Sequence, residues 1–223
     1  MRQKLSSAAA VFALLLCVCA AASAQEAAGL SDSEESSRPQ RGVYGMERAA
    51  HEYGVWGGGS FSSPTLIGST ERVRLGLVAF RYARVVARGD NLALKYTLDV
   101  PVAALSFPSF EATASGVREV RKTITGAGLS PVGFQLNFRR RERVQPFAQA
   151  SGGFLYFGER VPDTRGAQFN FTGDFGGGVQ WKTGGRRAWT VGYRYHHVSN
   201  GYRADINPGF DSNLFYVGFS LFR

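Results

Sequence analysis

The chain has 223 residues, enough for one domain or two small ones, with 44% hydrophobic and 19% charged residues. This balance is too apolar for a disordered chain and too polar for a bundle of membrane-spanning helices. The formal net charge of +9 favours an anionic partner, either nucleic acid or an anionic membrane surface. Glycine (28 residues) and aromatic residues (13%) are both abundant, which favours strands and turns over helices.

The N-terminus has the pattern of a secretory signal peptide. Arg2 and Lys4 precede an apolar run, Ala8 to Ala22, which is followed by an A-x-A cleavage site. The run is shorter than the roughly 20 residues that a spanning helix needs, which argues against a membrane anchor. We therefore expect residues 1–24 to be a signal peptide. Residues 25–41 lack aromatic residues and periodicity, and we expect them to be a disordered lead-in.

Export excludes several classes of site and partner. Cys17 and Cys19 both lie inside the signal, so the mature chain has neither a disulfide framework nor a zinc site with cysteine ligands. An exported chain has little access to nucleic acid, so we expect no nucleic-acid partner and assign the positive charge to a membrane surface. The sequence has no EF-hand, phosphate-binding loop or paired metal-ligand motif, and we expect neither a metal nor a cofactor.

Alternation with a period of two is the main pattern after residue 41. Between residues 92 and 102, large apolar residues alternate with smaller or polar ones, and the segments 132–138 and 168–182 behave in the same way. Strands of about ten residues with one apolar and one polar side are typical of a transmembrane β-barrel, which is apolar outside and polar inside. Eight strand candidates follow one another: 50–62, 72–87, 91–102, 126–139, 145–158, 167–182, 188–200 and 212–222.

The predicted connections alternate in length. Those after the second, fourth and sixth strands are short turns, whereas those after the third, fifth and seventh are longer, and 103–125 is the longest. Outer-membrane barrels have this pattern, with turns in the periplasm and loops outside. We predict an all-β fold, an eight-stranded antiparallel transmembrane β-barrel over residues 42–223, with a lumen filled by side chains. Its outward-facing residues should include Leu94, Leu98, Phe134, Phe171, Val191 and Phe219.

A soluble periplasmic barrel of the lipocalin type would also alternate, but with its apolar side chains inside. Its outer face would then carry the polar residues of these strands, namely Lys95, Asp99, Gln135, Asn137, Asp174 and Lys182. Two tryptophans favour the membrane barrel. Trp181 and Trp189 flank the turn at 183–187 on the apolar face, as expected for the aromatic girdle at a membrane interface. We expect them to be outward-facing neighbours at the periplasmic end.

A histidine and a serine share one face of the seventh predicted strand. His197 and Ser199 are two residues apart, about 6.6 Å along a strand, so their side chains can meet. A histidine base beside a serine nucleophile is the first requirement of acyl-transfer catalysis. Both residues have lipid-facing parity, an unusual place for polar groups unless the substrate is a lipid. They should lie roughly 20 Å from Trp189 along the barrel axis, near the outer interface.

The segment His197-Val-Ser-Asn-Gly201, followed by Asn207-Pro-Gly-Phe-Asp211, resembles the lipid A 3-O-deacylase (PagL-like) family of outer-membrane esterases. The segments 146–156 and 169–178 also look like that family, so the resemblance covers about 145–223 and the first half only in architecture. The resemblance implies an eight-stranded barrel with a Ser-His-acid triad on its outer surface. It also implies removal of the ester-linked acyl chain at the 3-position of lipid A.

The resemblance assigns roles to individual residues. It implies Ser199 as nucleophile, His197 as base and Asp211 as acid, with Asn200 and Asn207 matching conserved asparagines. Asn207 is the better candidate for the oxyanion hole. The best-known family member has glutamate at the acidic position, and aspartate is one methylene shorter, so Asp205 is an alternative acid.

Several other residues, and the function itself, have more than one interpretation. His196 has lumen parity and should form hydrogen bonds inside the barrel. Arg203, together with Arg118, Arg121 and Lys122, could pair with lipid A phosphates or be ordinary loop charges. The alternatives to an esterase are a non-catalytic structural barrel of the OmpX or OmpA kind and a soluble lipid-binding barrel. The expected partners are lipopolysaccharide as substrate and the outer membrane as location, while the sequence leaves the acyl preference and the oligomeric state open.

Overall fold

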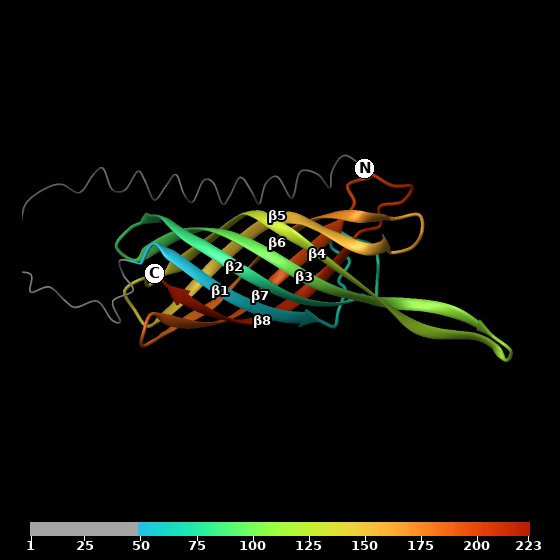
Figure 1. Cartoon of the computed structure of the whole chain (residues 1–223), viewed down its shortest axis with the longest axis horizontal. Helices are drawn as coiled ribbons and strands as arrows, with labels where there is room; N and C mark the ends of the chain where they lie inside the picture. Colours follow the sequence, from blue (N-terminus) through green and yellow to red (C-terminus); the bar gives the residue numbers. More distant parts are fainter. Residues whose placement is uncertain (1–48) are drawn as a thin grey trace, which may run out of the picture. The chain divides into compact units, whose positions relative to one another are not determined.

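The computed structural model describes residues 49–223, which form eight antiparallel strands closed into a barrel (Figure 1). Each strand pairs with the next one in sequence, and β8 closes the ring on β1. The predicted fold class is therefore confirmed. No helix among the described residues is long and apolar enough to cross a membrane. The strands are β1 (His51–Ser60), β2 (Arg74–Arg88), β3 (Leu92–Thr113), β4 (Gly116–Phe138), β5 (Val144–Val161), β6 (Ala167–Thr183), β7 (Arg187–Ser199) and β8 (Phe210–Phe222).

The predicted signal peptide (1–24) and lead-in (25–41) lie outside the described residues. The two ends of the barrel differ less in their connections than the sequence predicted. One end, called the turn end below, carries the short β2–β3, β4–β5 and β6–β7 connections. The other, called the loop end, carries the β1–β2 loop (61–73), the β5–β6 loop (162–166) and the β7–β8 loop (200–209).

The apolar side of each strand faces outward. The six residues predicted to face outward are intermediate or exposed, while the alternate residues beside them are buried. Trp181 and Trp189 are direct cross-strand partners near the turn end, with 50% and 52% of their surfaces exposed. Phe219 of β8 extends this aromatic row, with its ring centroid 5.1 Å from that of Trp189. The predicted parity and the tryptophan pair are both confirmed.

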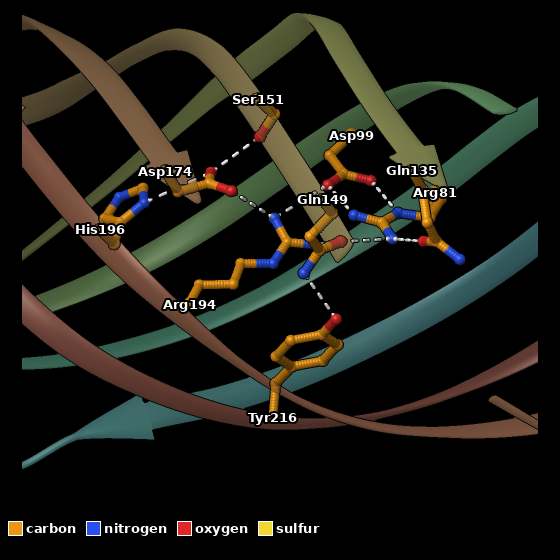
Figure 2. Close-up of polar contacts among 9 residues, drawn as sticks. All are labelled: Arg81, Asp99, Gln135, Gln149, Ser151, Asp174, Arg194, His196 and Tyr216. Atoms are coloured by element: carbon orange, nitrogen blue, oxygen red, sulfur yellow. Dashed lines mark hydrogen bonds and ion pairs between the residues drawn. The ribbon is translucent and has the colours of Figure 1, made fainter. Parts of the chain in front are cut away.

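The interior carries a buried network of charged and polar side chains (Figure 2). Arg81 donates two hydrogen bonds of 2.7 Å to the carboxylate of Asp99. Arg194 lies 3.4 Å from the carboxylates of both Asp99 and Asp174, and Ser151 donates to Asp174 at 2.7 Å. His196 joins the network through Nδ1, 3.6 Å from Asp174, and so lies in the lumen as predicted. Because the two arginines face two carboxylates, the buried charges compensate one another.

This interior decides against the soluble barrel. All six polar residues that a lipocalin-type barrel would place outside are buried in the lumen: Lys95, Asp99, Gln135, Asn137, Asp174 and Lys182. The outward faces carry exposed valine, phenylalanine and tryptophan instead. An apolar exterior around a polar interior is the arrangement that a lipid environment stabilises.

The lumen is not polar throughout. Near the loop end, the inward side chains form an apolar cluster that includes Leu155, Phe157, Val198, Phe210 and Leu214. Phe157, Leu155, Val198 and Leu214 are completely buried. This cluster lies behind the outer ends of β7 and β8, so side chains that project outward there rest on a packed core.

Two connections predicted to be longer loops are short. The β5–β6 connection (162–166) is no longer than the β4–β5 turn (139–143). Residues 103–125, expected to be the longest connection, continue β3 to Thr113 and resume at Gly116 in β4. The two strands stay paired without a break from Val102–Ala127 to Thr113–Gly116, so only a two-residue turn connects them. Figure 1 shows this hairpin projecting beyond the other strands. Its register persists because Leu105, Phe107 and Ile124 remain buried beyond the point where the alternation weakens in sequence.

Candidate active site

The predicted histidine and acid lie side by side on the outward face at the loop end. His197 of β7 and Asp211 of β8 are direct cross-strand partners. His197 Nδ1 lies 2.6 Å from Asp211 Oδ1. The histidine side chain is 20% exposed, whereas the aspartate side chain is completely buried. Asp205, the alternative acid, is an exposed residue of the β7–β8 loop, and no hydrogen bond or ion pair joins it to His197.

The register explains why the shorter acid reaches the histidine. Direct cross-strand partners have Cβ atoms about 4.5–5.5 Å apart, a separation that an aspartate and an imidazole can bridge. Because the Asp211 bond occupies Nδ1, it directs Nε2 of His197 away from β8 and leaves it as the atom for proton exchange.

The β1–β2 loop binds the other oxygen of the acid. The backbone N–H groups of Ile67 and Gly68 donate to Asp211 Oδ2 at 2.8 and 2.9 Å. The same loop continues across the start of β8, where Ser69 N donates to Pro208 O and Thr70 N donates to Gly209 O. Three donors therefore surround a buried carboxylate, which fixes its orientation and satisfies its charge.

The sequence did not reveal this loop as part of the site. Its contribution comes from backbone amides, which any residue except proline can supply, so residue types give no signal. The glycine at position 68 is the one residue type in this loop that reflects its close approach to β8. A Cβ atom at Gly68 would lie 2.8 Å from both the Cα and N atoms of Phe210, closer than real Cβ atoms come.

Replacing Gly68 tests whether the loop positions the acid. Gly68→Ala should lower kcat about tenfold with little change in KM, because the loop must move away from Phe210 and weaken its bonds to Asp211. Gly89→Ala is the matched control, since a Cβ there meets nothing within 4 Å and the residue lies at the turn end. Steady-state hydrolysis of a detergent-dispersed ester measures both values, and an unchanged kcat would contradict a positioning role.

Ser199 lies at the end of β7, beside His197 but without a hydrogen bond to it in this structure. Both side chains border Gly209 of the β7–β8 loop, which has a φ of 59°. A Cβ atom at Gly209 would lie 3.1 Å from His197 Cε1 and 3.4 Å from Ser199 Cβ. Glycine at this position therefore leaves open the space between the two groups.

The two candidate asparagines have different roles in the β7–β8 loop. Asn207 Oδ1 accepts a hydrogen bond of 2.9 Å from the backbone N–H of Asn200. Both polar atoms of the Asn200 side chain form hydrogen bonds within the loop: Nδ2 donates to Ile206 O, and Oδ1 accepts from Arg203 N. Asn207 Nδ2 has no partner among the described residues, and Asn207 borders the same small cavity as Ser199. Asn207 is thus placed to donate to a bound group, whereas Asn200 closes the loop.

The outward surface next to His197 has a strip without side chains. Gly173 of β6 is the cross-strand partner of His197, and Gly152 of β5 is the partner of Gly173. A Cβ at Gly173 would meet nothing within 4 Å, and one at Gly152 would have its nearest neighbour at 3.8 Å. Phe171 and Phe175 border the strip on either side along β6 and are exposed. An extended apolar chain could lie in this strip with one end at His197 and Ser199.

The remaining charged candidates near the loop end separate into two groups. Arg121 is held by Ser106 and by the carbonyl of Arg72, and Lys122 pairs with Glu159 of β5, so these two side chains have structural partners. Arg203 instead lies over the rings of Phe169 and Phe171. Among the described residues, no cluster of three or more His, Cys, Asp or Glu could hold a metal ion.

Solved structures similar to this chain include those of three other proteins. The crystal structure of the outer membrane enzyme PagL superposes with a TM-score of 0.52 at 16% identity, covering 77% of this chain and 99% of that chain. Neisserial surface protein A (NspA) gives a TM-score of 0.43 at 12% identity, with 77% and 95% coverage. Outer membrane protein AlkL gives 0.34 at 12% identity, with 85% and 94% coverage. At 16% identity the likeness to PagL shows the fold alone.

Comparison by sequence assigns the family. No curated protein matches the chain. The family model described as lipid A 3-O-deacylase (PagL) matches residues 90–220, more than half of the chain, including His197, Ser199 and Asp211. The chain therefore belongs to the PagL family of lipid A 3-O-deacylases.

Proposed function

We propose that the protein is an outer-membrane esterase that removes the ester-linked acyl chain from the 3-position of lipid A by a Ser-His-Asp mechanism. The observation that carries this proposal is the buried Asp211 carboxylate on the outward face, bonded to His197 and held by two backbone amides. Burying a carboxylate at a lipid-facing surface costs free energy, so its presence there supports a functional role. Family membership supports the substrate class.

The residues have complementary roles in this mechanism. His197 Nε2 accepts the proton of Ser199 as the hydroxyl attacks the ester carbonyl, and Asp211 stabilises the imidazolium that forms. The free amide of Asn207 donates to the developing oxyanion, an interaction worth about 3 kcal/mol in a serine protease. As the bond between the acyl carbon and the sugar oxygen breaks, the protonated His197 gives its proton to that oxygen, and the sugar leaves with a free hydroxyl. Water hydrolyses the acyl-enzyme by the same steps and releases a fatty acid.

The surroundings of the site suit a lipid ester. The strip over Gly173 and Gly152 can receive the acyl chain, because it begins at His197 and is bordered by Phe171 and Phe175. The site lies at the loop end, at the opposite end of the barrel from the tryptophan pair, which we place at the periplasmic interface. The ester would then be reached at the level of the outer-leaflet headgroups. A signal peptide at residues 1–24 would deliver the chain to this membrane.

Mass spectrometry of lipid A is the direct test. Lipid A from cells that produce the protein should lose the mass of one acyl chain, and cells that produce Ser199→Ala should keep the full mass. Fragmentation of the product should show a free hydroxyl at the 3-position. An unchanged spectrum with a correctly folded protein would favour the structural barrel, and loss of a chain from another position would refute the assigned specificity.

A further inference from the structure

A pocket of about 420 Å³ lies beside the candidate active site, between the outer ends of β5 and β6 and the β7–β8 loop. Phe169 lines it, and the ring of Phe169 packs edge-on against that of Phe171, with the centroids 5.2 Å apart. Phe171 is in turn the cross-strand partner of Ser199. One aromatic residue therefore separates the pocket from the candidate nucleophile. The polar and aromatic residues that line the pocket are Tyr156, Arg160, Gln168, Phe169, Arg203 and Asp205.

The guanidinium group of Arg203 is available to a ligand. It lies 5.7 Å from the ring centroid of Phe169 and 5.3 Å from that of Phe171. Within residues 49–223 it has no hydrogen bond or ion pair, so its N–H donors are unused. Stacking on aromatic faces holds a guanidinium plane in place while its edge remains free to donate. The backbone of Arg203 is fixed by Asn200, whose carbonyl and side-chain oxygens each lie 3.3 Å from its N–H.

Arg160 supplies a second positive charge to the same pocket. Its Nη1 donates to the carbonyl of Thr164 at 3.0 Å, which holds the side chain and leaves its other N–H groups unused. The nearby Asp163 is already bound by Arg165, whose hydrogen bonds lower the pKa of that carboxyl. Asp205 is the single acidic residue in the lining, so two guanidinium groups face one carboxylate. The pocket therefore favours an anion.

We propose that this pocket binds a phosphate group of the glycolipid headgroup whose acyl ester reacts at Ser199. This inference rests on the proposed function, because it takes lipid A, a phosphorylated disaccharide, as the substrate. Two guanidinium edges match the geometry of a phosphate, which arginine recognises with paired hydrogen bonds. With the phosphate held beyond Phe171, the sugar lies over that ring and its ester reaches Ser199. The pocket thus orients the headgroup and selects phosphorylated lipids.

Binding to an inactive variant tests the proposal without relying on catalysis. In the Ser199→Ala background in detergent micelles, lipid A should bind about tenfold more tightly than the same lipid after removal of its phosphates. The double change Arg160→Gln and Arg203→Gln should abolish that preference. The charge-matched control, Arg139→Gln with Arg141→Gln, removes two arginines at the turn end, outside the pocket, and should preserve it. Equal binding of the two lipids by the Ser199→Ala protein would overturn the proposal.

Two further experiments complete the test. One distinguishes a lipid phosphate from free phosphate, and the other distinguishes failure of this proposal from failure of the esterase proposal. Inorganic phosphate should displace phosphorylated lipid A only weakly, and displacement by micromolar inorganic phosphate would overturn the assignment to a headgroup. In the active chain, the double glutamine variant should raise KM for phosphorylated lipid A about tenfold and leave kcat unchanged. A wild-type chain that releases no fatty acid but keeps phosphate-dependent binding would refute the esterase proposal alone.

Discussion

Ser199→Ala should lower the rate of lipid A deacylation by at least about a thousandfold and leave a folded barrel. Without its hydroxyl group the chain has no nucleophile beside His197, and the remaining interactions can only bind the ester. Ser199 is partly exposed at the end of β7 and has no hydrogen bond in the structure, so its removal leaves no buried group without a partner. Release of fatty acid from purified lipid A in detergent measures the rate.

The double variant shows whether the two residues act together. His197→Ala should be about as damaging as Ser199→Ala, and the combination should be little worse than either, because members of a triad act as a unit. Ser212→Ala is a suitable control, since Ser212 is buried on the opposite face of β8 and its hydroxyl has no hydrogen-bond partner. Heat-modifiable mobility on gels would report folding. Full activity of Ser199→Ala would show that another group is the nucleophile.

The fold could be predicted because its physical signal is local. Alternation of apolar and polar residues assigns each side chain to a face, and an error of one residue would have placed Asp99 and Asp174 in contact with lipid. The tryptophan pair was predictable for the same reason, since both residues flank one tight turn. The hairpin extension was not, because pairing beyond residue 102 depends on tertiary contacts of Leu105 and Ile124 rather than on alternation.

The site was predictable only where side chains carry the chemistry. His197 and Ser199 share a face in any strand, and the family motif added Asp211 and Asn207. The choice between Asp211 and Asp205 required the β7–β8 register, which the sequence of a single strand does not contain. The two backbone donors from Ile67 and Gly68 come from the far end of the chain. The same register puts the glycine strip and part of the arginine pocket on β5 and β6, beside the reacting groups.

Those two backbone donors change what Asp211→Asn should do. From the sequence we would expect a moderate loss, smaller than that of Ser199→Ala, because asparagine can still hold the imidazole. In the structure, Asp211 Oδ2 accepts from both Ile67 N and Gly68 N, so the amide NH₂ of an asparagine cannot occupy that side. The asparagine oxygen must take this place, and its NH₂ group then faces His197 Nδ1.

This orientation imposes the wrong tautomer. An NH₂ group that donates to Nδ1 requires the imidazole proton on Nε2, the atom that should accept the proton of Ser199. Asp211→Asn should therefore lower kcat by about a thousandfold to ten-thousandfold with KM nearly unchanged. Asp211→Ala should retain more activity than Asp211→Asn, because an unrestrained imidazole can still adopt the active tautomer. Measuring kcat and KM of both variants on the same lipid tests this order of activity. If Asp211→Asn is the more active of the two, the backbone donors do not set the orientation of this side chain.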